Sequence, residues 1–337
     1  MSLRKRWLSA VFAPVALFGV FAAGGVQAEV IKIATTAPDG TAWMKEMRAG
    51  ADAVKTRTEG RVEVKYYPGG VMGDPATVQR KIKIGQLHGG AFTGGEISAN
   101  NPDVQVYGLP FLFRNQAEVD AVRAKFDQRI KDGFEKGGFV ALGLSGGGFA
   151  YIMSARDIKT RDELKAAKVW VPQGDYIAEV AFKAVGVTPI SLPLADVYTS
   201  LQTGLIDTAA NTFAGAIAFQ WHTKIKHIVD LPVSYVVGVI VVDKKSFDKI
   251  AAADQAVLKD EMAKAFARLD QISIEDNAKA VEALRKQGIS VYQPNAEETT
   301  NWQKVGAESA QSLDSDKAPS AEIIKAVNDE LAANRKK

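Results

Sequence analysis

The sequence predicts a two-domain α/β protein with one long helix that spans both domains. Its 337 residues are 47% hydrophobic, which is enough to bury two separate cores. Short strand-like runs alternate with stretches of helical periodicity, and this alternation favours a parallel sheet covered by helices. Residues 254–287 contain no proline or glycine and keep a near-helical spacing of apolar residues. At 1.5 Å per residue, a helix of about 34 residues would be roughly 50 Å long, well beyond the ~30 Å of a small domain.

The N-terminal half of the chain supplies the first strand–helix units. Strands are predicted at residues 30–34, 62–66 and 87–92. The first helix has Thr41 or Asp39 as its cap and runs to about Thr58, and a second helix passes through residues 78–84. Parallel sheets bind ligands beyond the carboxyl ends of their strands. The loops after residues 34, 67 and 92 are therefore candidate binding segments.

A second domain is expected to start at the glycine cluster 146–148. Before it lie a predicted helix at 116–136 and a strand at 139–144, and after it an apolar strand at 149–154. Further helices are predicted near 162, at 176–185 and at 197–203, and further strands at 169–171, 206–210 and 235–242. The last strand (YVVGVIVV) is apolar throughout, which is typical of a strand buried on both faces.

The long helix precedes two further predicted helices, at 296–311 and 320–333. Two shorter helices broken near 274–277 are the alternative to one long helix. We place residues 29–147 and 236–275 in the first domain. The second domain takes residues 148–235 and 276–330, and residues 331–337 are expected to form a solvated tail.

Residues 1–28 have the features of a secretory signal peptide. Arg4, Lys5 and Arg6 precede an apolar stretch of about 17 residues, which Pro14 interrupts and which is short for a membrane span. Small residues at the −3 and −1 positions predict cleavage after Ala28, so we expect export to a periplasm. The formal net charge of +3 belongs to the three basic residues of this leader, and the remaining chain has 39 basic and 39 acidic residues.

The composition excludes several kinds of chemistry. The chain has no cysteine, which rules out disulfides, thiolate catalysis and cysteine-based metal sites. The three histidines lack the spacing of a metal pair, and no phosphate-binding or dinucleotide-binding loop occurs in its proper context. A balanced charge also argues against nucleic-acid binding. We therefore predict no cofactor, no metal and no nucleic-acid partner.

One motif suggests a secreted serine hydrolase. Residues 143–147 (GLSGG) match G-x-S-x-G with Ser145 as nucleophile. Possible partners follow in the hydrolase order, namely Asp196, Asp207, His222 and His227. A nucleophile elbow must lead directly into a helix, however, and here Ser145 is followed by glycines and a predicted strand. Catalysis by Ser145 is kept as the alternative, and the glycines are interpreted as a crossover between domains.

Four stretches of the sequence carry a family resemblance. They are residues 67–74 (YPGGVMGD), 108–114 (GLPFLFR), 164–172 (LKAAKVWVP) and 193–207 (PLADVYTSLQTGLID). Because of these four stretches, the chain from about residue 30 to 315 resembles the DctP-type substrate-binding proteins of TRAP transporters. The resemblance implies a periplasmic-binding-protein-like fold, two α/β domains joined by hinge strands. It also implies capture of a small solute, without catalysis, by a monomer that delivers the solute to a permease of small and large membrane subunits. A sensory or scaffold role without a permease is a further alternative.

The sequence departs from this family where carboxylates are usually bound. Members that bind organic acids usually place an arginine in the R-V-P stretch, where it pairs with a ligand carboxylate, but here Trp170 stands in its place. A second family arginine aligns near Ala150. Asn211 does match the family's ligand-contacting asparagine. An organic acid is our first expectation, and a cationic or zwitterionic solute, or another polar or apolar one, is the alternative.

The predicted ligand-binding residues combine three kinds of side chain. Aromatic rings would supply apolar or π surfaces, although each ring could instead be part of the core. Carboxylates would attract an amine, and hydroxyl or amide groups would hold a carboxylate. They are Trp43, Phe92, Phe149, Trp170 and Phe213; Asp74, Glu96 and Asp175; and Thr36, Thr93, Gln173 and Asn211.

Overall fold

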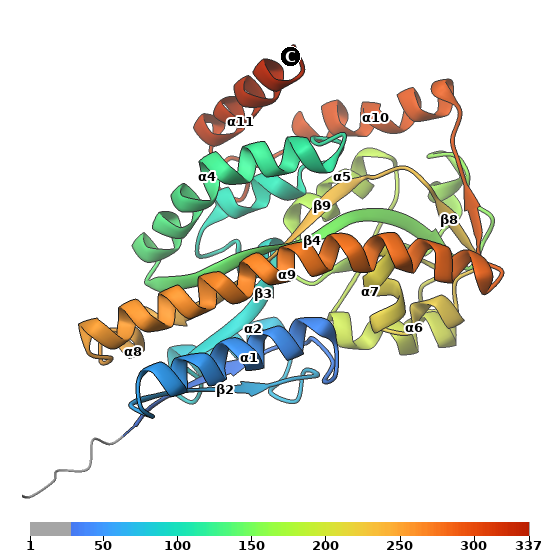
Figure 1. The fold of residues 1–337 in the computed structure, drawn as a ribbon. Coiled ribbons are helices and arrows are strands. Elements are labelled where there is room, and N and C mark those ends of the chain that lie inside the picture. The colour runs from blue at the N-terminus through green and yellow to red at the C-terminus, as the bar shows by residue number, and fades with distance from the viewer. Residues whose placement is uncertain (1–27, 337) are drawn as a thin grey trace, which may run out of the picture.

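A mixed sheet forms the centre of the molecule in the computed structural model, which describes residues 28–336 (Figure 1). The predicted leader, apart from Ala28, lies outside these residues. In the described part of the chain the sheet has eight strands, in the order β10-β8-β4-β9-β3-β1-β2, with β7 paired to β4. These strands are β1 (Glu29–Ala34), β2 (Val62–Tyr67), β3 (Gly89–Thr93), β4 (Phe139–Ser154), β7 (Thr208–Asn211), β8 (His227–Val229), β9 (Ser234–Asp243) and β10 (Ser290–Tyr292). A second small sheet pairs β5 (Trp170–Pro172) with β6 (Ile190–Leu192).

Two long strands connect the ends of this sheet and so define two lobes. The first lobe contains β1, β2 and β3, and the second contains β5, β6, β7, β8 and β10, while β4 and β9 run through both. β4 and β9 pair antiparallel from Phe139 and Asp243 to Ala150 and Ser234. The sequence predicted two strands where β4 is one strand of 16 residues. It also predicted a parallel sheet, whereas β3 pairs antiparallel with β9, and β7 and β8 pair antiparallel with β4. A strand that crosses between lobes must run antiparallel to its return strand, which explains the mixed sheet.

The glycine cluster lies where β4 passes between the lobes. A Cβ atom on Gly146 would lie 2.0 Å from the Tyr235 hydroxyl oxygen. Gly148 has φ +111°, and a Cβ there would lie 2.6 Å from Nδ2 of Asn277. The register of β4 against β9 also shifts between Gly146 and Gly148. The crossover therefore requires glycine both for its close contacts and for its backbone conformation.

Helices cover both faces of the sheet. In the first lobe they are α1 (Ala42–Arg57), α2 (Pro75–Lys83), the short α3 (Gly94–Ile97), α4 (Gln116–Lys136) and α8 (Lys244–Phe247). In the second lobe they are α5 (Tyr176–Ala184), α6 (Val197–Thr203), α7 (Phe213–Ala218) and α10 (Ala296–Ala310). Thr41 caps α1 as predicted, because its hydroxyl oxygen accepts a hydrogen bond from the Met44 amide at 3.3 Å. No helix in residues 28–336 combines the length and apolar character that a membrane span requires.

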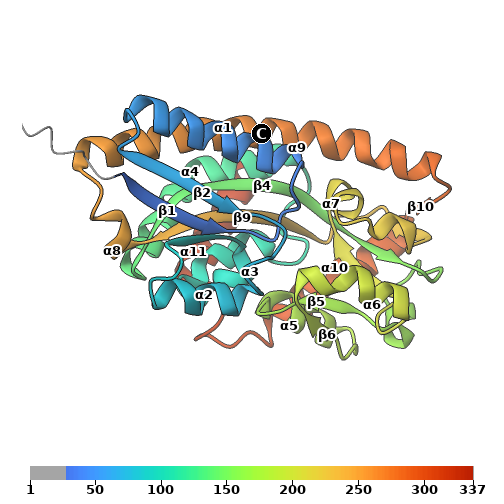
Figure 2. The ribbon, with the colours of Figure 1, turned by 90° about the horizontal axis from the view of Figure 1, so that it is seen from below.

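The predicted long helix is present as α9, a single unbroken helix of 35 residues (Ala252–Lys286). At 1.5 Å per residue it is about 52 Å long. It lies along α1 in the first lobe and continues over α7 in the second (Figure 2). Leu258 and Met262 are buried in the first-lobe core, whereas Ala280 and Leu284 are buried in the second-lobe core. The alternative of two helices broken near 274–277 is therefore wrong.

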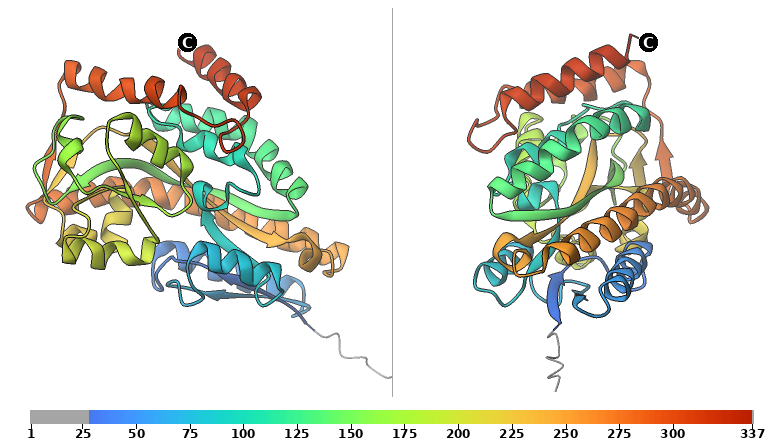
Figure 3. Two further views of the ribbon diagram at one scale, coloured as in Figure 1. Left: turned by 180° about the vertical axis from the view of Figure 1, so that it is seen from behind. Right: turned by 60° about the vertical axis from the view of Figure 1, so that its left-hand side comes forward.

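The last helix, α11 (Ala321–Asn334), packs on α4 of the first lobe (Figures 1 and 3). Ile323, Val327 and Leu331 are buried in the same core as residues of α4. Beyond them, Arg335 pairs with Glu118 at 2.7 Å. From the sequence, the second domain was expected to reach residue 330 and a solvated tail to begin at 331. The structure differs because the i, i+4, i+8 spacing of these apolar residues continues to Leu331 and needs a partner.

Candidate ligand-binding cleft

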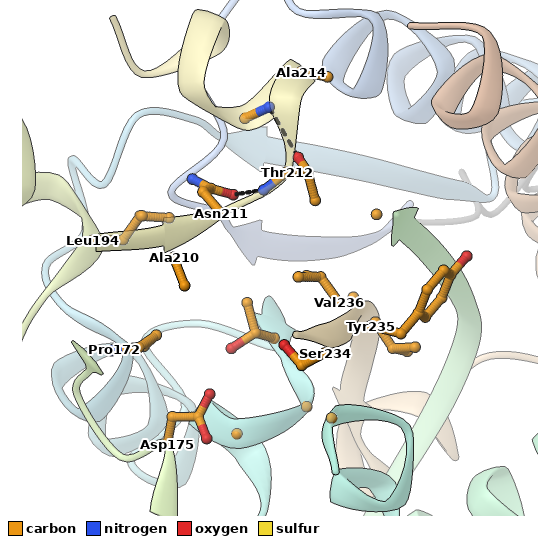
Figure 4. A pocket seen from close by; sticks show the side chains of 18 of the residues that line it. Pro172, Asp175, Leu194, Ala210, Asn211, Thr212, Ala214, Ser234, Tyr235 and Val236 are labelled. Atoms are coloured by element: carbon orange, nitrogen blue, oxygen red, sulfur yellow. Dashed lines mark hydrogen bonds between the residues drawn. The ribbon is translucent and has the colours of Figure 1, made fainter. Parts of the chain in front are cut away.

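A cleft of about 700 Å³ lies between the two lobes, and we call it the interlobe cleft. The first lobe contributes the start of α1 and the β3–α3 segment, and the second contributes the segments that lead into α5 and α7. The middles of β4, β9 and α9 complete its lining. Asn211 and Asp175 of the second lobe surround one open space together with Ser234 and Tyr235 of β9 (Figure 4). This volume is within the range of pockets that hold small organic ligands.

Most of the predicted ligand-binding residues line this cleft. Those that do are Thr36, Trp43, Phe92, Thr93, Glu96, Trp170, Asp175 and Asn211. They come from both lobes, and Thr36 and Thr93 lie at the carboxyl ends of β1 and β3, where parallel strands place ligand sites. The structure does not place Asp74, Phe149, Gln173 and Phe213 in the lining.

The four remaining residues lie in other surroundings. Asp74 caps α2, with its Oδ1 accepting a hydrogen bond from the Thr77 amide at 2.6 Å, and this bond holds the pKa of the Asp74 carboxyl below its usual value. Gln173 is exposed. Phe149 packs edge-on against Tyr235, with ring centroids 5.1 Å apart. Phe213 stacks on Tyr151 at 4.1 Å. Phe213 is a buried core residue, and Phe149 is partly buried and packs against the core, which was the alternative considered for every aromatic residue.

Trp170 forms part of the cleft wall but is mostly engaged in packing. It is 3% exposed, and its ring meets Trp221 edge-to-face at 5.3 Å. Its indole Nε1 donates a hydrogen bond to the Leu192 carbonyl oxygen at 2.9 Å. At the position where the family often has an arginine, this side chain thus offers a ring surface to a solute and no free donor.

Two carboxyl groups from opposite lobes lie beside each other at the cleft. Glu96 of α3 accepts a hydrogen bond from the Thr93 amide at 2.8 Å and completes a capping box with Thr93. Asp175 caps α5 by accepting from the Ala178 amide at 3.0 Å. A Cβ atom on Gly95 would lie 2.7 Å from the Asp175 carboxyl carbon, so the two segments are in close contact.

Burial changes the protonation of both carboxyls. Burial raises the pKa of Glu96 to about 7. Hydrogen bonds from Thr93 oppose this rise, and the nearby negative charge of Asp175 adds to it. Burial also raises the pKa of Asp175, while its hydrogen bonds from the α5 backbone oppose the rise. Both groups therefore hold a proton more readily than an ordinary carboxyl.

The lining residues supply little positive charge. Among residues 28–336, no arginine lines the cleft, and Lys279 of α9 is its one lysine. The Lys279 side chain is 74% exposed and lies 3.6 Å from the Glu275 carboxylate. Ala150, where a second arginine was expected from the family, is buried and lies outside the lining. The arginine clamp that the sequence lacked at these positions is not replaced by another lining arginine.

Several lining residues could not be identified from the sequence. Ser234 and Tyr235 begin a strand that reads as ordinary core, and nothing in its pattern separates them from their neighbours. Gln105 is 3% exposed and donates from Nε2 to the Lys317 carbonyl oxygen at 2.7 Å, but its Oε1 atom is buried without a partner. A lone glutamine within a short apolar segment was the one signal for this position in the sequence.

The described residues do not assemble a serine triad. Ser145 is 4% exposed on the middle of β4, opposite Gly238, and has no hydrogen bond from a histidine in residues 28–336. His222 Nδ1 lies 3.2 Å from the Ala216 carbonyl oxygen, and His227 Nδ1 lies 3.5 Å from the Asp157 carboxylate. In the same part of the chain, no three histidine or acidic side chains are grouped so that they could hold a metal ion.

Comparison with known families decides the assignment. Residues 33–316 match the model of the DctP family, described as "Bacterial extracellular solute-binding protein, family 7". The chain belongs to the DctP family. The resemblance carried by the four sequence stretches is thereby confirmed. The family consists of binding proteins, in agreement with the cleft between two lobes.

Other DctP-like proteins show the same relationship. A "Solute-binding protein" of Verminephrobacter eiseniae is 29% identical over 245 residues, which are 72% of this chain and 72% of that protein. A TRAP periplasmic solute-binding protein from Desulfovibrio salexigens, solved with bound orotic acid, superimposes with a TM-score of 0.84 at 20% identity, covering 90% of this chain and 99% of that one. Another from Xanthobacter autotrophicus, with bound β-D-galacturonate, gives 0.82 at 21% identity, with coverage of 90% and 99%. These structures confirm the predicted two-domain fold.

Proposed function

We propose that this protein captures a small organic acid in the periplasm and delivers it to a TRAP-type permease of small and large membrane subunits. The observation that carries the proposal is the interlobe cleft of about 700 Å³ in a member of a solute-binding family. A ligand held between two lobes can stabilise their closed arrangement, because it contacts both. The two lobes are taken as the two domains, with α11 assigned to the first because it packs on α4.

The organic-acid class is supported by relatives of the same fold. The solved relatives from Desulfovibrio salexigens and Xanthobacter autotrophicus contain orotic acid and galacturonate, both of which carry a carboxylate. In this chain a carboxylate would have to be held without arginine. Asn211 is suited to this role, because its Oδ1 accepts from the Thr212 amide at 2.8 Å and its amide nitrogen remains available (Figure 4). Hydroxyl groups of Thr93 and Ser234 line the same space.

Export and processing complete the proposal. The basic and apolar segments of residues 1–28 favour cleavage after Ala28 by a signal peptidase. The first strand, β1, begins at Glu29, so this cleavage would leave the sheet intact. Mass spectrometry of protein secreted to the periplasm should give a mature chain that starts at Glu29. The mature chain is proposed to be a monomer, which light scattering measures directly.

A thermal-shift screen tests the capture of a solute. Because a ligand that binds only the folded state raises its stability by RT ln(1 + [L]/Kd), a binding organic acid should raise the unfolding temperature. Asn211→Ala should weaken that acid about tenfold, as measured by calorimetry. If no organic acid, sugar acid or aromatic acid in a broad panel shifts the unfolding temperature, the proposed ligand class is wrong.

We further propose that the protein is not an enzyme. Ser145 should stay unlabelled by a serine-directed fluorophosphonate probe, because no base among residues 28–336 is placed to activate it. Ester hydrolysis by the purified mature protein, abolished by Ser145→Ala, would overturn this part of the proposal and restore the hydrolase alternative.

A further inference from the structure

We propose that the solute is an organic acid that also carries a protonated amine, and that this amine lies between the carboxylates of Glu96 and Asp175. The inference rests on the proposed function and names the class of solute more closely. It starts from the charge of the cleft, which the lining residues make acidic. Glu96, Asp175 and Asp276 face it, and Lys279 is its one lining lysine among the described residues.

The Glu96 and Asp175 carboxylates have no cationic partner in residues 28–336. Each accepts a hydrogen bond from backbone N–H groups at the start of its own helix, and neither forms an ion pair with lysine, arginine or histidine. Glu96 is only 9% exposed. A carboxylate held so far from water without a cation is unfavourable, and a bound ammonium group would supply the missing charge.

A third acceptor lines the same cleft as this pair. Gln105 lines the same cleft, is 97% buried, and leaves its Oε1 atom without a hydrogen-bond donor. Its segment packs on α3, since a Cβ on Gly94 would lie 3.4 Å from the Val104 carbonyl oxygen. A protonated amine has two or three N–H donors and no acceptor, so it matches a site that offers carboxylate and amide oxygens.

The position of the pair links amine binding to the contact between lobes. Glu96 belongs to α3 of the first lobe and Asp175 to the start of α5 in the second. An amine between them would bond to both lobes at once, whereas two unshielded carboxylates would repel each other. Aromatic rings of Trp43, Phe92 and Tyr235 also line the cleft, and such rings attract cations.

An anion without an amine is disfavoured by the same arrangement. Its carboxylate would enter a cleft with three acidic side chains, and Lys279 is exposed and already near Glu275. The amine of a zwitterion would meet the acidic pair, while its carboxylate could reach Asn211 and the hydroxyls beside it. The acidic pair, Asn211 and these hydroxyl groups all line one cleft, so a single small solute can contact them all.

Matched probe triples test the inference by calorimetry at pH 7.5. Each triple has an amino acid, the acid without its amine, and the amine without its acid. We choose 4-aminobutanoate, butanoate and butylamine; proline, cyclopentanecarboxylate and pyrrolidine; and 4-(aminomethyl)benzoate, 4-methylbenzoate and 4-methylbenzylamine. In at least one triple the amino acid should bind at least thirtyfold more tightly than the acid without the amine.

Two conservative variants locate the amine. Glu96→Gln preserves the capping box and Asp175→Asn preserves the helix cap, so both remove charge while keeping the local hydrogen bonds. Each should reduce the preference for the amino acid over the matched acid at least tenfold. Asp74→Asn is the matched control, because Asp74 caps a helix of the same length, nine residues, outside the cleft. It should bind like the wild type.

The outcomes separate this inference from the proposed function. Equal or tighter binding of the acid without its amine would overturn the inference and leave capture of an organic acid in place. If none of the three amino acids binds, the inference is also overturned. The thermal-shift screen of the broad acid panel would then test the proposed function by itself. Binding of the bare amine as tightly as the amino acid would support the acidic amine site and contradict the organic-acid class. Wild-type preference in both charge-removing variants would overturn the assigned position of the amine.

Discussion

Replacement of Glu96 by glutamine should change how the stability of the protein depends on pH. Burial raises the pKa of Glu96 from 4.5 to about 7. The folded protein therefore binds this proton more tightly than the unfolded chain does. The resulting stabilisation is fully present below about pH 4.5 and is lost as the pH rises through about 7. The difference between these pKa values corresponds to about 3 kcal/mol of free energy of unfolding.

Urea unfolding of the wild type and Glu96→Gln at pH 5, 6, 7 and 8 measures this effect. Between pH 5 and pH 8 the free energy of unfolding of the wild type, relative to the variant, should fall by about 2–3 kcal/mol. Glutamine can still accept the Thr93 N–H, so loss of the capping box should not obscure the result. Asp175, which faces Glu96, titrates in the same direction because burial raises its pKa too.

Asp74→Asn provides the contrasting control for this experiment. A hydrogen bond from the Thr77 backbone lowers the pKa of Asp74, so its stabilisation is present above the ordinary carboxyl pKa and is lost only as the pH falls below it. Its difference from the wild type should stay constant from pH 5 to pH 8. If the wild type and Glu96→Gln instead give parallel stability curves over this range, the reasoning about the buried carboxyl is refuted.

Three substitutions test the packing that supports the cleft. Gly143→Ala should lower the free energy of unfolding by about 1–3 kcal/mol in urea, because its Cβ would lie 2.1 Å from a ring carbon of Phe266; unchanged stability would contradict this contact. Arg123→Met should cost about 3–5 kcal/mol by the same measurement, since it breaks an ion pair with Asp270 at 2.9 Å; a stabilised variant would show that the pair is dispensable. Trp170→Ala should lower stability by about 3–5 kcal/mol because the indole is 3% exposed, and should weaken an identified solute roughly tenfold in calorimetry; wild-type affinity would remove the ring from the site.

The long helix and the crossover could be predicted because each leaves a recognisable pattern within a short stretch of sequence. Residues 254–287 contain no proline or glycine that would end a helix, and α9 runs unbroken from Ala252 to Lys286. The glycines at 146–148 marked the passage of β4 between lobes, where Tyr235 and Asn277 leave no room for a Cβ. The helix follows from its local sequence alone, whereas at the crossover the glycines mark a constraint that residues distant in the sequence impose.

The orientation of individual side chains could not be predicted in the same way. The register of β4 against β9 shifts twice, between Ala141 and Gly143 and between Gly146 and Gly148. Each shift changes which face of the sheet the following residues occupy, so strand alternation alone cannot tell whether Phe149 faces the cleft or packs against the core. The periodicity of α11 likewise located a helix but not the lobe on which it packs, because that choice depends on contacts distant in sequence.

The most direct test of the account is a titration of the mature protein and one cleft-filling variant with a solute that stabilises the wild type. Ser234 lines the interlobe cleft, so Ser234→Trp should fill the space that the solute occupies. Ser191 is exposed on β6 outside the cleft, and Ser191→Trp is the matched control. The account predicts one binding site per chain in the wild type and in Ser191→Trp, and at least a hundredfold loss of affinity in a folded Ser234→Trp variant. Undiminished binding in the folded Ser234→Trp variant would contradict capture of the solute between the lobes.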